Sequence, residues 1–269
     1  MIGSSVGPPA VDAAGYQALR TLVRHRLGIE LGDGKQALVA ARVTRRLRAT
    51  GTTVLADYLR LLDQDGDELV QLLDAISTNT TSFWREPRAF QLCDQAVRAW
   101  LGAGQRRFRL WSAAASTGME AYTLAILMAE NGAAAHDCAI LCTDISTRVL
   151  EACRAGIYDL RAVEPVAADL RRKYFAALGG QVQASPDLRR MLTVNRLNLN
   201  RPPFPMRGPL DVIFCRNVMI YFPIEVRQAL LDECVRLLRP GGLLLIGAAE
   251  SLSGLRHPLA SIAPAAFRK

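Results

Sequence analysis

Four short segments of the chain combine small, polar and charged residues in a way that suits ligand binding. Residues 113–120 read AAASTGME, residues 143–145 read TDI and residues 215–222 read CRNVMIYF. Each lies at the end of an apolar run, which predicts a position where a buried strand ends. The fourth segment, residues 78–85, reads TNTTSFWR and precedes these strands. Because open α/β sheets bind ligands at the carboxyl ends of their strands, the segments predict a binding site there.

The residue types in these segments favour a nucleoside-type ligand. Small residues around Ser116 and Gly118 let the backbone approach a ligand closely. The dinucleotide glycine fingerprint and the phosphate-binding GK[ST] loop are both absent, which argues against NAD and ATP. Asp144 ends the next strand and suits hydrogen bonding to ribose hydroxyls. Each feature alone has a plain structural explanation, a tight turn or a helix cap, but together they favour a nucleoside.

The elements that must position these segments alternate between strand and helix after residue 106. The predicted strands cover residues 108–114, 139–145, 210–215 and 243–248, and the predicted helices cover residues 120–131, 146–155 and 225–238. Uniformly apolar strands that alternate with helices predict an α/β domain with a parallel sheet covered on both faces. Residues 158–194 interrupt this rhythm and are expected to form an insertion with a helix and a small hairpin.

Residues 11–75 show only helical spacing of apolar side chains, which predicts a small all-α N-terminal domain. Residues 76–105 are expected to link it to the α/β domain of residues 106–269 and to begin the ligand site. The chain has 33 Lys and Arg against 25 Asp and Glu, a net charge of +8 that favours an acidic partner. Arg42, Arg45 and Arg46 share one helix face. This basic stripe is either a docking surface or an ordinary solvated face.

The cysteine pattern and hydropathy predict a cytoplasmic protein without a metal site. None of the six cysteines forms a CxxC pair, and the three histidines do not join them at zinc-ligand spacing. Reduced, buried thiols are therefore expected. The longest apolar runs stop far short of the roughly 20 residues that span a bilayer, and no secretory signal is recognised at the N-terminus. We therefore expect no direct insertion into a membrane.

The same segments closely resemble the chemotaxis receptor methyltransferase (CheR) family. The matching motifs are residues 78–85, 111–118, 143–145 and 214–218, with LRPGG at 238–242 and AESL at 249–252 near the C-terminus. The N-terminal stretch from residue 28 through residue 46 is also similar to the family. The resemblance runs in order through nearly the whole chain. It implies a Rossmann-like doubly wound sheet of the S-adenosylmethionine-dependent methyltransferase type, with a small all-α N-terminal domain and a small insertion subdomain.

The resemblance further implies S-adenosylmethionine as cofactor and glutamate side chains on chemoreceptor helices as substrate, with a glutamate methyl ester and S-adenosylhomocysteine as products. The residues that it implies for the cofactor site are Asn79, Thr81, Arg85, Glu120, Asp144, Asn198, Leu199, Arg216 and Asn217. Arg85 and Tyr221 would lie nearest the chemistry, and Arg42, Arg45 and Arg46 would face the receptor. The insertion is short around residues 178–183, as in members that do not need a receptor C-terminal tail peptide.

The sequence offers three alternatives to this function. The same chemistry could act on a receptor-like protein of another signalling pathway. A module that binds the cofactor without activity is a second alternative, against which the presence of Arg85 and Tyr221 argues. A nucleic-acid methyltransferase would use a base-flipping pocket and an Asn/Asp-Pro-Pro-Tyr-like motif, which the sequence lacks. The basic helix also offers no stacking aromatics or groove-reading motif, so no nucleic-acid partner is expected.

Overall fold

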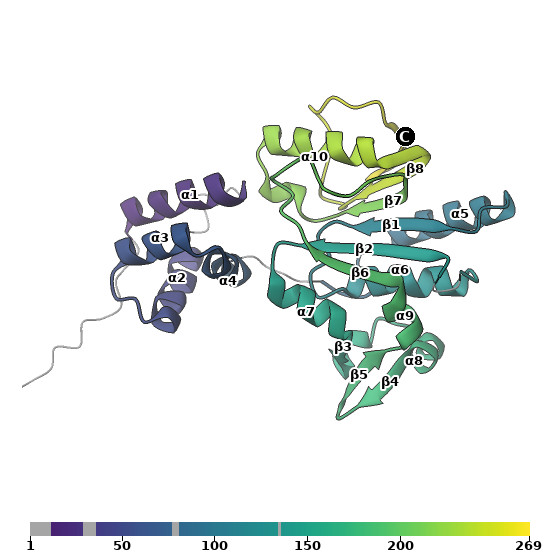
Figure 1. Ribbon diagram of the computed structural model, residues 1–269, viewed down its shortest axis with the longest axis horizontal. Coiled ribbons are helices and arrows are strands. Elements are labelled where there is room, and N and C mark those ends of the chain that lie inside the picture. Colours follow the sequence, from purple (N-terminus) through teal and green to yellow (C-terminus); the bar gives the residue numbers. More distant parts are fainter. Residues whose placement is uncertain (1–11, 29–35, 77–80, 134–135) are drawn as a thin grey trace, which may run out of the picture. The chain divides into compact units, whose positions relative to one another are not determined.

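The computed structural model describes residues 12–28, 36–76, 81–133 and 136–269 (Figure 1). The chain divides into two compact units, which are described separately below. The first is the N-terminal helical part, with which residues 221–223 group. The second contains the remaining residues from 80 onwards and is built on β-sheet. In the described part of the chain, no helix is both long and apolar enough to cross a membrane.

The N-terminal unit is helical, as its apolar spacing predicts. Its helices are α1 (Ala13–Leu27), α2 (Gln36–Thr50), α3 (Leu55–Gln64) and α4 (Gly66–Ile76). The side chain of Asp12 caps α1 by accepting a hydrogen bond from the Gly15 N–H at 2.7 Å. The core consists of apolar side chains at helical spacing, among them Leu19, Val23, Val39, Val43, Leu47, Tyr58 and Leu62. Helix α2 packs against α4, and α1 packs against α3.

The second unit is built around a seven-stranded sheet whose order is β6-β2-β1-β7-β8-β10-β9. Its strands are β1 (Phe108–Ser112), β2 (Cys138–Asp144), β6 (Leu192–Arg196), β7 (Leu210–Cys215), β8 (Leu238–Ile246), β9 (Ala260–Ala263) and β10 (Ala266–Arg268). The first five strands in this order are parallel, and the last two pair antiparallel. Every residue of β7 is buried, which explains its apolar run from Val212 to Cys215. The predicted parallel α/β sheet is confirmed.

Helices cover this sheet, and the sequence predicts three of them, α6 (Met119–Glu130), α7 (Thr147–Ala155) and α10 (Ile224–Leu237), which the short 3₁₀ helix η3 (Met219–Tyr221) precedes. A further helix, α5 (Pro87–Gly102), lies in residues 76–105, which were expected to be a linker. Helices α6 and α7 pack on β2, whereas α5 and α10 pack on β8. Ser146 caps α7 through a hydrogen bond from the Val149 N–H. All six cysteines of the chain are buried and free of disulfides, as predicted.

A small subdomain follows α7 and contains a second sheet of order β3-β5-β4. Its elements are β3 (Ile157–Asp159), the 3₁₀ helix η2 (Leu160–Val163), α8 (Ala168–Tyr174), β4 (Phe175–Leu178), β5 (Gln181–Ala184) and α9 (Pro186–Met191). Gly179 and Gly180 both have positive φ in the β4–β5 turn. Strand β6 pairs with β2 in the main sheet although it starts at Leu192, inside the predicted insertion. Its mostly exposed residues give it no apolar run.

Candidate functional site

The loops that carry most of the predicted site residues lie at one edge of the main sheet. Strands β6, β2, β1, β7 and β8 are parallel, so their carboxyl ends share that edge. Asp144 ends β2, residues 113–118 follow β1, and residues 216–218 follow β7. Asn198 and its neighbour follow β6, and residues 247–250 follow β8. This is the edge at which open α/β sheets bind ligands.

Backbone strain concentrates in two of these loops and in the segment before α5. Among the described residues, five non-glycine residues have positive φ, and four of them are Trp84 (53°), Glu86 (54°), Ser116 (50°) and Asn217 (56°). The left-handed conformation costs a non-glycine residue on the order of 1–3 kcal/mol and persists only where the surroundings impose it. Two of the strained residues flank Arg85, and the other two follow β1 and β7. The strain therefore supports a functional role for this edge.

Hydrogen bonds fix the loop after β1 against the end of β2. The Ser116 N–H donates to Asp144 Oδ2 at 2.9 Å, and the Ser146 N–H donates to Asp144 Oδ1 at 3.1 Å. The indole of Trp111 donates to Thr143 Oγ1 at 2.9 Å. At Gly118, with φ at 89°, a Cβ would lie 2.6 Å from Cys153 Sγ. Only glycine fits there without displacing α7, so the small-residue loop is required by packing.

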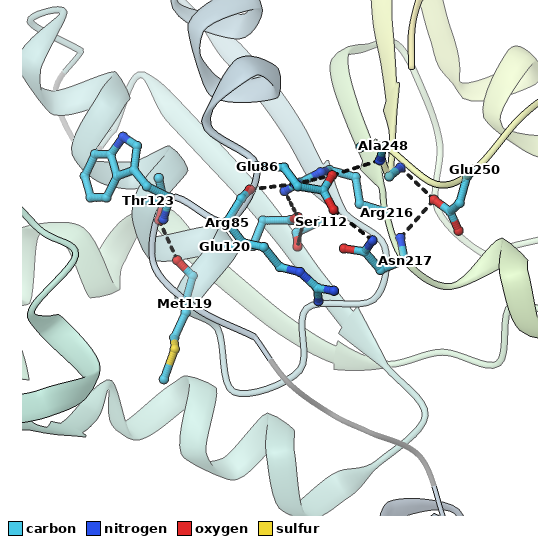
Figure 2. A network of polar contacts seen from close by, with 12 residues as sticks. Arg85, Glu86, Ser112, Met119, Glu120, Thr123, Arg216, Asn217, Ala248 and Glu250 are labelled. Atoms are coloured by element: carbon cyan, nitrogen blue, oxygen red, sulfur yellow. Dashed lines mark hydrogen bonds and ion pairs between the residues drawn. The ribbon is translucent and has the colours of Figure 1, made fainter. Parts of the chain in front are cut away.

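Arg216 forms the buried centre of an ionic cluster (Figure 2). Its side chain is 1% exposed and lies 2.9 Å from Glu120 Oε2 and 3.0 Å from Glu86 Oε2. Its Nη2 also donates to the Arg85 carbonyl oxygen at 2.6 Å. Ser112 Oγ donates to the other oxygen of Glu120 at 2.7 Å. Burial raises the pKa of Glu120 more than Arg216 and Ser112 lower it. The cluster thus joins the segment before α5 to the loop after β7.

A second carboxylate, that of Glu250, fixes the turn that begins at Asn217 (Figure 2). Glu250 accepts hydrogen bonds from five backbone N–H groups at 2.6–3.3 Å, those of Asn217, Val218, Met219, Ile220 and Gly247. A Cβ at Gly247 would lie 2.6 Å from Asn217 Nδ2 and 2.8 Å from Glu250 Oε2. The approach of β8 to this turn therefore requires glycine at position 247.

Two of these residues, Glu86 and Glu250, were not among the site residues predicted from the sequence. Glu250 belongs to the AESL motif that resembled the family, and that motif was its only signal. Glu86 had no signal beyond its position next to Arg85. Both act on partners that are distant in sequence: Glu86 bonds to Asn217 at a separation of 131 residues, and Glu250 to Asn217 at 33. Only the sheet topology makes these contacts visible.

The structure brings some of the sequence-predicted site residues together and leaves others apart. Direct contacts join Arg85, Glu120 and Arg216, and Glu86 links Asn217 to them. The sheet edge adds Asp144, Leu199, which is buried, and Asn198, whose Oδ1 accepts from the Asn200 N–H at 2.9 Å. Thr81 and Arg85 are half-buried, Tyr221 ends η3, and Asn79 lies outside the described residues. Arg42, Arg45 and Arg46 all lie on α2 in the helical unit.

The parallel sheet, the carboxylate that ends β2 and the strained polar loops together define a nucleoside-binding α/β domain. Comparison with known proteins identifies the family. The model of the CheR methyltransferase SAM-binding domain matches residues 79–265, and that of the CheR methyltransferase all-alpha domain matches residues 14–77. The chain belongs to the CheR methyltransferase family, and its cofactor is S-adenosylmethionine.

Curated relatives cover nearly the whole chain. Chemotaxis protein methyltransferase 2 of Pseudomonas aeruginosa is 36% identical over 252 residues, which are 92% of this chain and 90% of that protein. The chemotaxis protein methyltransferase of Escherichia coli is 37% identical over 257 residues, 92% of this chain and 88% of that protein. The corresponding protein of Borreliella burgdorferi is 32% identical over 259 residues, 92% of this chain and 91% of that protein.

The residues at the sheet edge fit this cofactor. Ser116 Oγ and Thr117 Oγ1 are buried in the loop after β1 and have no hydrogen-bond partner among the described residues. Buried hydroxyls are normally satisfied, so these two are suited to bond with a ligand. The carboxylate of Asp144 suits the ribose hydroxyls, and that of Glu120 suits the ammonium group of the methionine part. The donors and acceptors of the loop therefore match a nucleoside that carries an amino acid.

Proposed function

We propose that this protein methylates glutamate side chains on the cytoplasmic helical bundle of chemoreceptors. It would use S-adenosylmethionine and give glutamate 5-O-methyl esters and S-adenosylhomocysteine, which makes it a protein-glutamate O-methyltransferase of sensory adaptation. The observation that carries the proposal is the family match over both domains, residues 14–77 and 79–265. The names of the relatives, chemotaxis protein methyltransferases, support the pathway.

We assign the cofactor site to Asn79, Thr81, Arg85, Glu120, Asp144, Asn198, Leu199, Arg216 and Asn217. Within this set, the Arg216 side chain is only 1% exposed. This supports a role in which Arg216 positions other residues of the site and does not itself bond to the cofactor. Its guanidinium is engaged by Glu86, Glu120 and the Arg85 carbonyl, so it holds those groups in place. Asp144 would bond to the ribose, and Glu120 to the ammonium of the methionine part.

The proposed reaction depends on orientation of the reacting groups by the protein more than on proton transfer. Bound S-adenosylmethionine supplies a methyl group attached to a positively charged sulfur. This sulfur is a leaving group that needs no protonation. A glutamate carboxylate has a reference pKa of about 4.3 and is ionised at neutral pH, so no general base is needed. Aligning the reacting groups can contribute roughly 7–11 kcal/mol. We assign Arg85 to guiding the substrate carboxylate through charge-assisted hydrogen bonds and Tyr221 to orienting it through its hydroxyl.

The receptor-docking surface is proposed to be α2 in the helical unit. Arg42 and Arg45 lie one turn apart on it, and Arg45 is exposed. Arg46 pairs with a carboxylate of the same helical unit: its Nε and Nη2 lie 3.0 and 2.5 Å from the two oxygens of Glu68. The docking proposal therefore rests on Arg42 and Arg45, whose charge complements glutamate-rich receptor helices. Arg46 would act by supporting the fold of the helix that presents them.

The short strands of the insertion subdomain support the proposal that the protein methylates receptors without binding their C-terminal tail. Its β4 and β5 strands have four residues each, joined by the Gly179–Gly180 turn. Calorimetry with a receptor-tail peptide tests this part of the proposal, because tight binding would contradict it. We place the protein in the cytoplasm, on the side of the membrane where the receptor bundle lies.

The decisive experiment is methyl labelling of candidate receptors with tritiated S-adenosylmethionine. We expect label on receptor glutamates that alkali releases as methanol, because methyl esters hydrolyse readily in base. A base-stable label would contradict ester formation. Label on a receptor-like protein of another pathway, with none on chemoreceptors, would favour the same chemistry outside chemotaxis. Cofactor binding without any labelling would favour an inactive binding module.

A further inference from the structure

Glu86 occupies a helix-capping position but does not cap its helix. It is the residue before α5, and its side chain makes no hydrogen bond to the first turn of that helix. The carboxylate instead reaches two other loops. It accepts from Arg216 Nη2 at 3.0 Å, from Asn217 Nδ2 at 3.2 Å and from the Ala248 N–H at 2.9 Å. Three segments that meet at the cofactor edge are therefore joined through one side chain (Figure 2).

The charge state of Glu86 decides how the Asn217 amide is turned. Burial alone would raise the pKa of Glu86, but hydrogen bonds from the Ala248 N–H, the Asn217 amide and Arg216 bring that pKa below its usual value. An ionised carboxylate only accepts hydrogen bonds. Asn217 must therefore present its Nδ2 hydrogens to Glu86 and direct Oδ1 elsewhere. No donor to Asn217 Oδ1 is found in the described part of the chain.

The backbone of Asn217 is fixed as firmly as its side chain. Its φ of 56° is held while its N–H donates to Glu250 Oε2 at 2.9 Å. The residue also directly follows Arg216, whose buried guanidinium is held by Glu86 and Glu120. Oδ1 is thus a fixed acceptor at the carboxyl end of β7. That strand is the neighbour of β1, which carries the cofactor loop.

We propose that Glu86 is a positioning residue that turns the Asn217 amide so that Oδ1 accepts a hydrogen bond from an amino group of S-adenosylmethionine. The cofactor has two such groups, the ammonium of its methionine part and the 6-amino group of its adenine. The inference rests on the proposed cofactor site and adds a residue to it. Glu86 acts through Asn217, without contacting the cofactor itself. A Gln at position 86 has both a donor and an acceptor, so it no longer imposes one orientation on Asn217.

The test measures the affinity of the purified full chain for S-adenosylhomocysteine by calorimetry, using Glu86→Gln, Asn217→Ala and the double variant. We expect each single change to weaken binding by about tenfold, the loss of one good hydrogen bond. The double variant should bind no worse than Asn217→Ala, because Glu86 acts through Asn217. Additive losses would overturn the proposal. Glu164→Gln is the matched control, since Glu164 is exposed and its hydrogen bond to Arg161 is made by the backbone N–H, which the change keeps.

Two analogues separate a positioning role from a merely structural one. S-inosylhomocysteine has an oxo group where adenine has its amino group, and 5′-methylthioadenosine lacks the amino-acid part. The tenfold penalty of Glu86→Gln should vanish for the analogue that lacks the amino group bound by Oδ1. A penalty that persists with both analogues would overturn the proposal.

A variant that does not fold and a protein that does not bind S-adenosylhomocysteine lead to different conclusions. If Glu86→Gln does not fold, as judged by thermal melting, Asn217→Ala carries the test with the same analogues. An Asn217→Ala protein that binds S-adenosylhomocysteine as tightly as wild type would overturn the role of Oδ1. Wild-type protein that fails to bind S-adenosylhomocysteine at all would instead overturn the proposed cofactor site on which this inference rests.

Discussion

Arg216 and Glu120 are separated by 96 residues in sequence, yet their side chains pair at 2.9 Å, where the Arg216 side chain is 1% exposed. The Arg216 guanidinium also lies 5.4 Å from the centroid of the Phe90 ring and 5.9 Å from that of Phe214. Aromatic faces and carboxylates thus surround it on several sides. This pairing makes Arg216 a support of the sheet edge where we propose that the cofactor binds, because Arg216 contacts both Glu120 and the Arg85 backbone.

Replacing Arg216 by Met should destabilise the catalytic unit strongly. The change leaves Glu120 and Glu86 without their cation, and breaking a buried pair by removing one partner costs about 3–5 kcal/mol. Urea unfolding followed by tryptophan fluorescence measures this free energy. Arg172→Met is the matched control, because Arg172 is exposed and should change stability by less than about 0.5 kcal/mol. Equal stability of the two variants would contradict a supporting role for Arg216.

Replacing Glu250 by Gln should lower both stability and cofactor affinity. The amide keeps one acceptor oxygen and turns an NH₂ group towards backbone N–H groups that now lack an acceptor. Unsatisfied buried donors cost about 1–3 kcal/mol each, so we expect a loss of about 3 kcal/mol in unfolding free energy. Denaturant unfolding and calorimetry measure the two effects. A variant that keeps wild-type stability would show that the Asn217 turn holds its shape without this carboxylate.

Arg45 and Arg46 should behave differently although they are adjacent in sequence. Arg46→Ala leaves Glu68, which is 7% exposed, without its cation, so it should destabilise the helical unit by about 3 kcal/mol. The Tyr58 hydroxyl, which donates to Glu68 at 2.7 Å, would be the remaining partner. Arg45→Ala should leave the melting temperature unchanged and reduce receptor methylation. Thermal melting and methyl labelling separate these effects, and unchanged labelling with Arg45→Ala would count against receptor docking on α2.

Tyr221→Phe tests the proposed orientation of the substrate carboxylate. We expect turnover to fall roughly tenfold, the loss of one hydrogen bond made to the reacting group, while the affinity for S-adenosylhomocysteine stays at the wild-type value. Steady-state kinetics and calorimetry provide the two numbers. Equal losses in turnover and in cofactor affinity would argue against this role for the hydroxyl.

Acid should destabilise the protein in part through Glu233. The hydrogen bonds from Arg236 lower the pKa of Glu233, burial opposes them, and the Phe204 N–H at 2.7 Å lowers it further. Below the ordinary glutamate pKa of about 4.3, the unfolded chain binds a proton that the folded protein does not. Stability from this group is therefore present above that pH and is lost as the pH falls through the lowered value.

Glu233→Gln tests this dependence, because an amide does not titrate. The unfolding free energy of the variant should fall less steeply than that of wild type as the pH drops below about 4.3. Urea unfolding at several pH values measures the slope. Glu164→Gln makes the same exchange of carboxylate for amide at an exposed position and is the matched control. Parallel curves for wild type and Glu233→Gln would contradict the assignment.

The sequence by itself determined most of the elements that form the main sheet and the helical unit, and it supplied the segments proposed for the site. Apolar runs predicted β1, β2, β7 and β8, because buried parallel strands must be apolar on both faces. Helical spacing predicted the all-α unit. Asp144 and the small loop around Ser116 could be proposed as site residues because ligand-binding chemistry requires particular residue types at strand ends. These features are local, so a linear pattern can record them.

Only the tertiary structure decided which residues support that site. Strand β6 was hidden because an edge strand that is mostly exposed has no apolar run. Arg46 looked like its exposed neighbour Arg45 until Glu68, 22 residues away, was seen to bind it. Glu86 and Glu250 bind groups on loops that only the strand order brings together. A carboxylate's role depends on the donors around it, and those donors come from segments whose proximity the linear sequence does not encode.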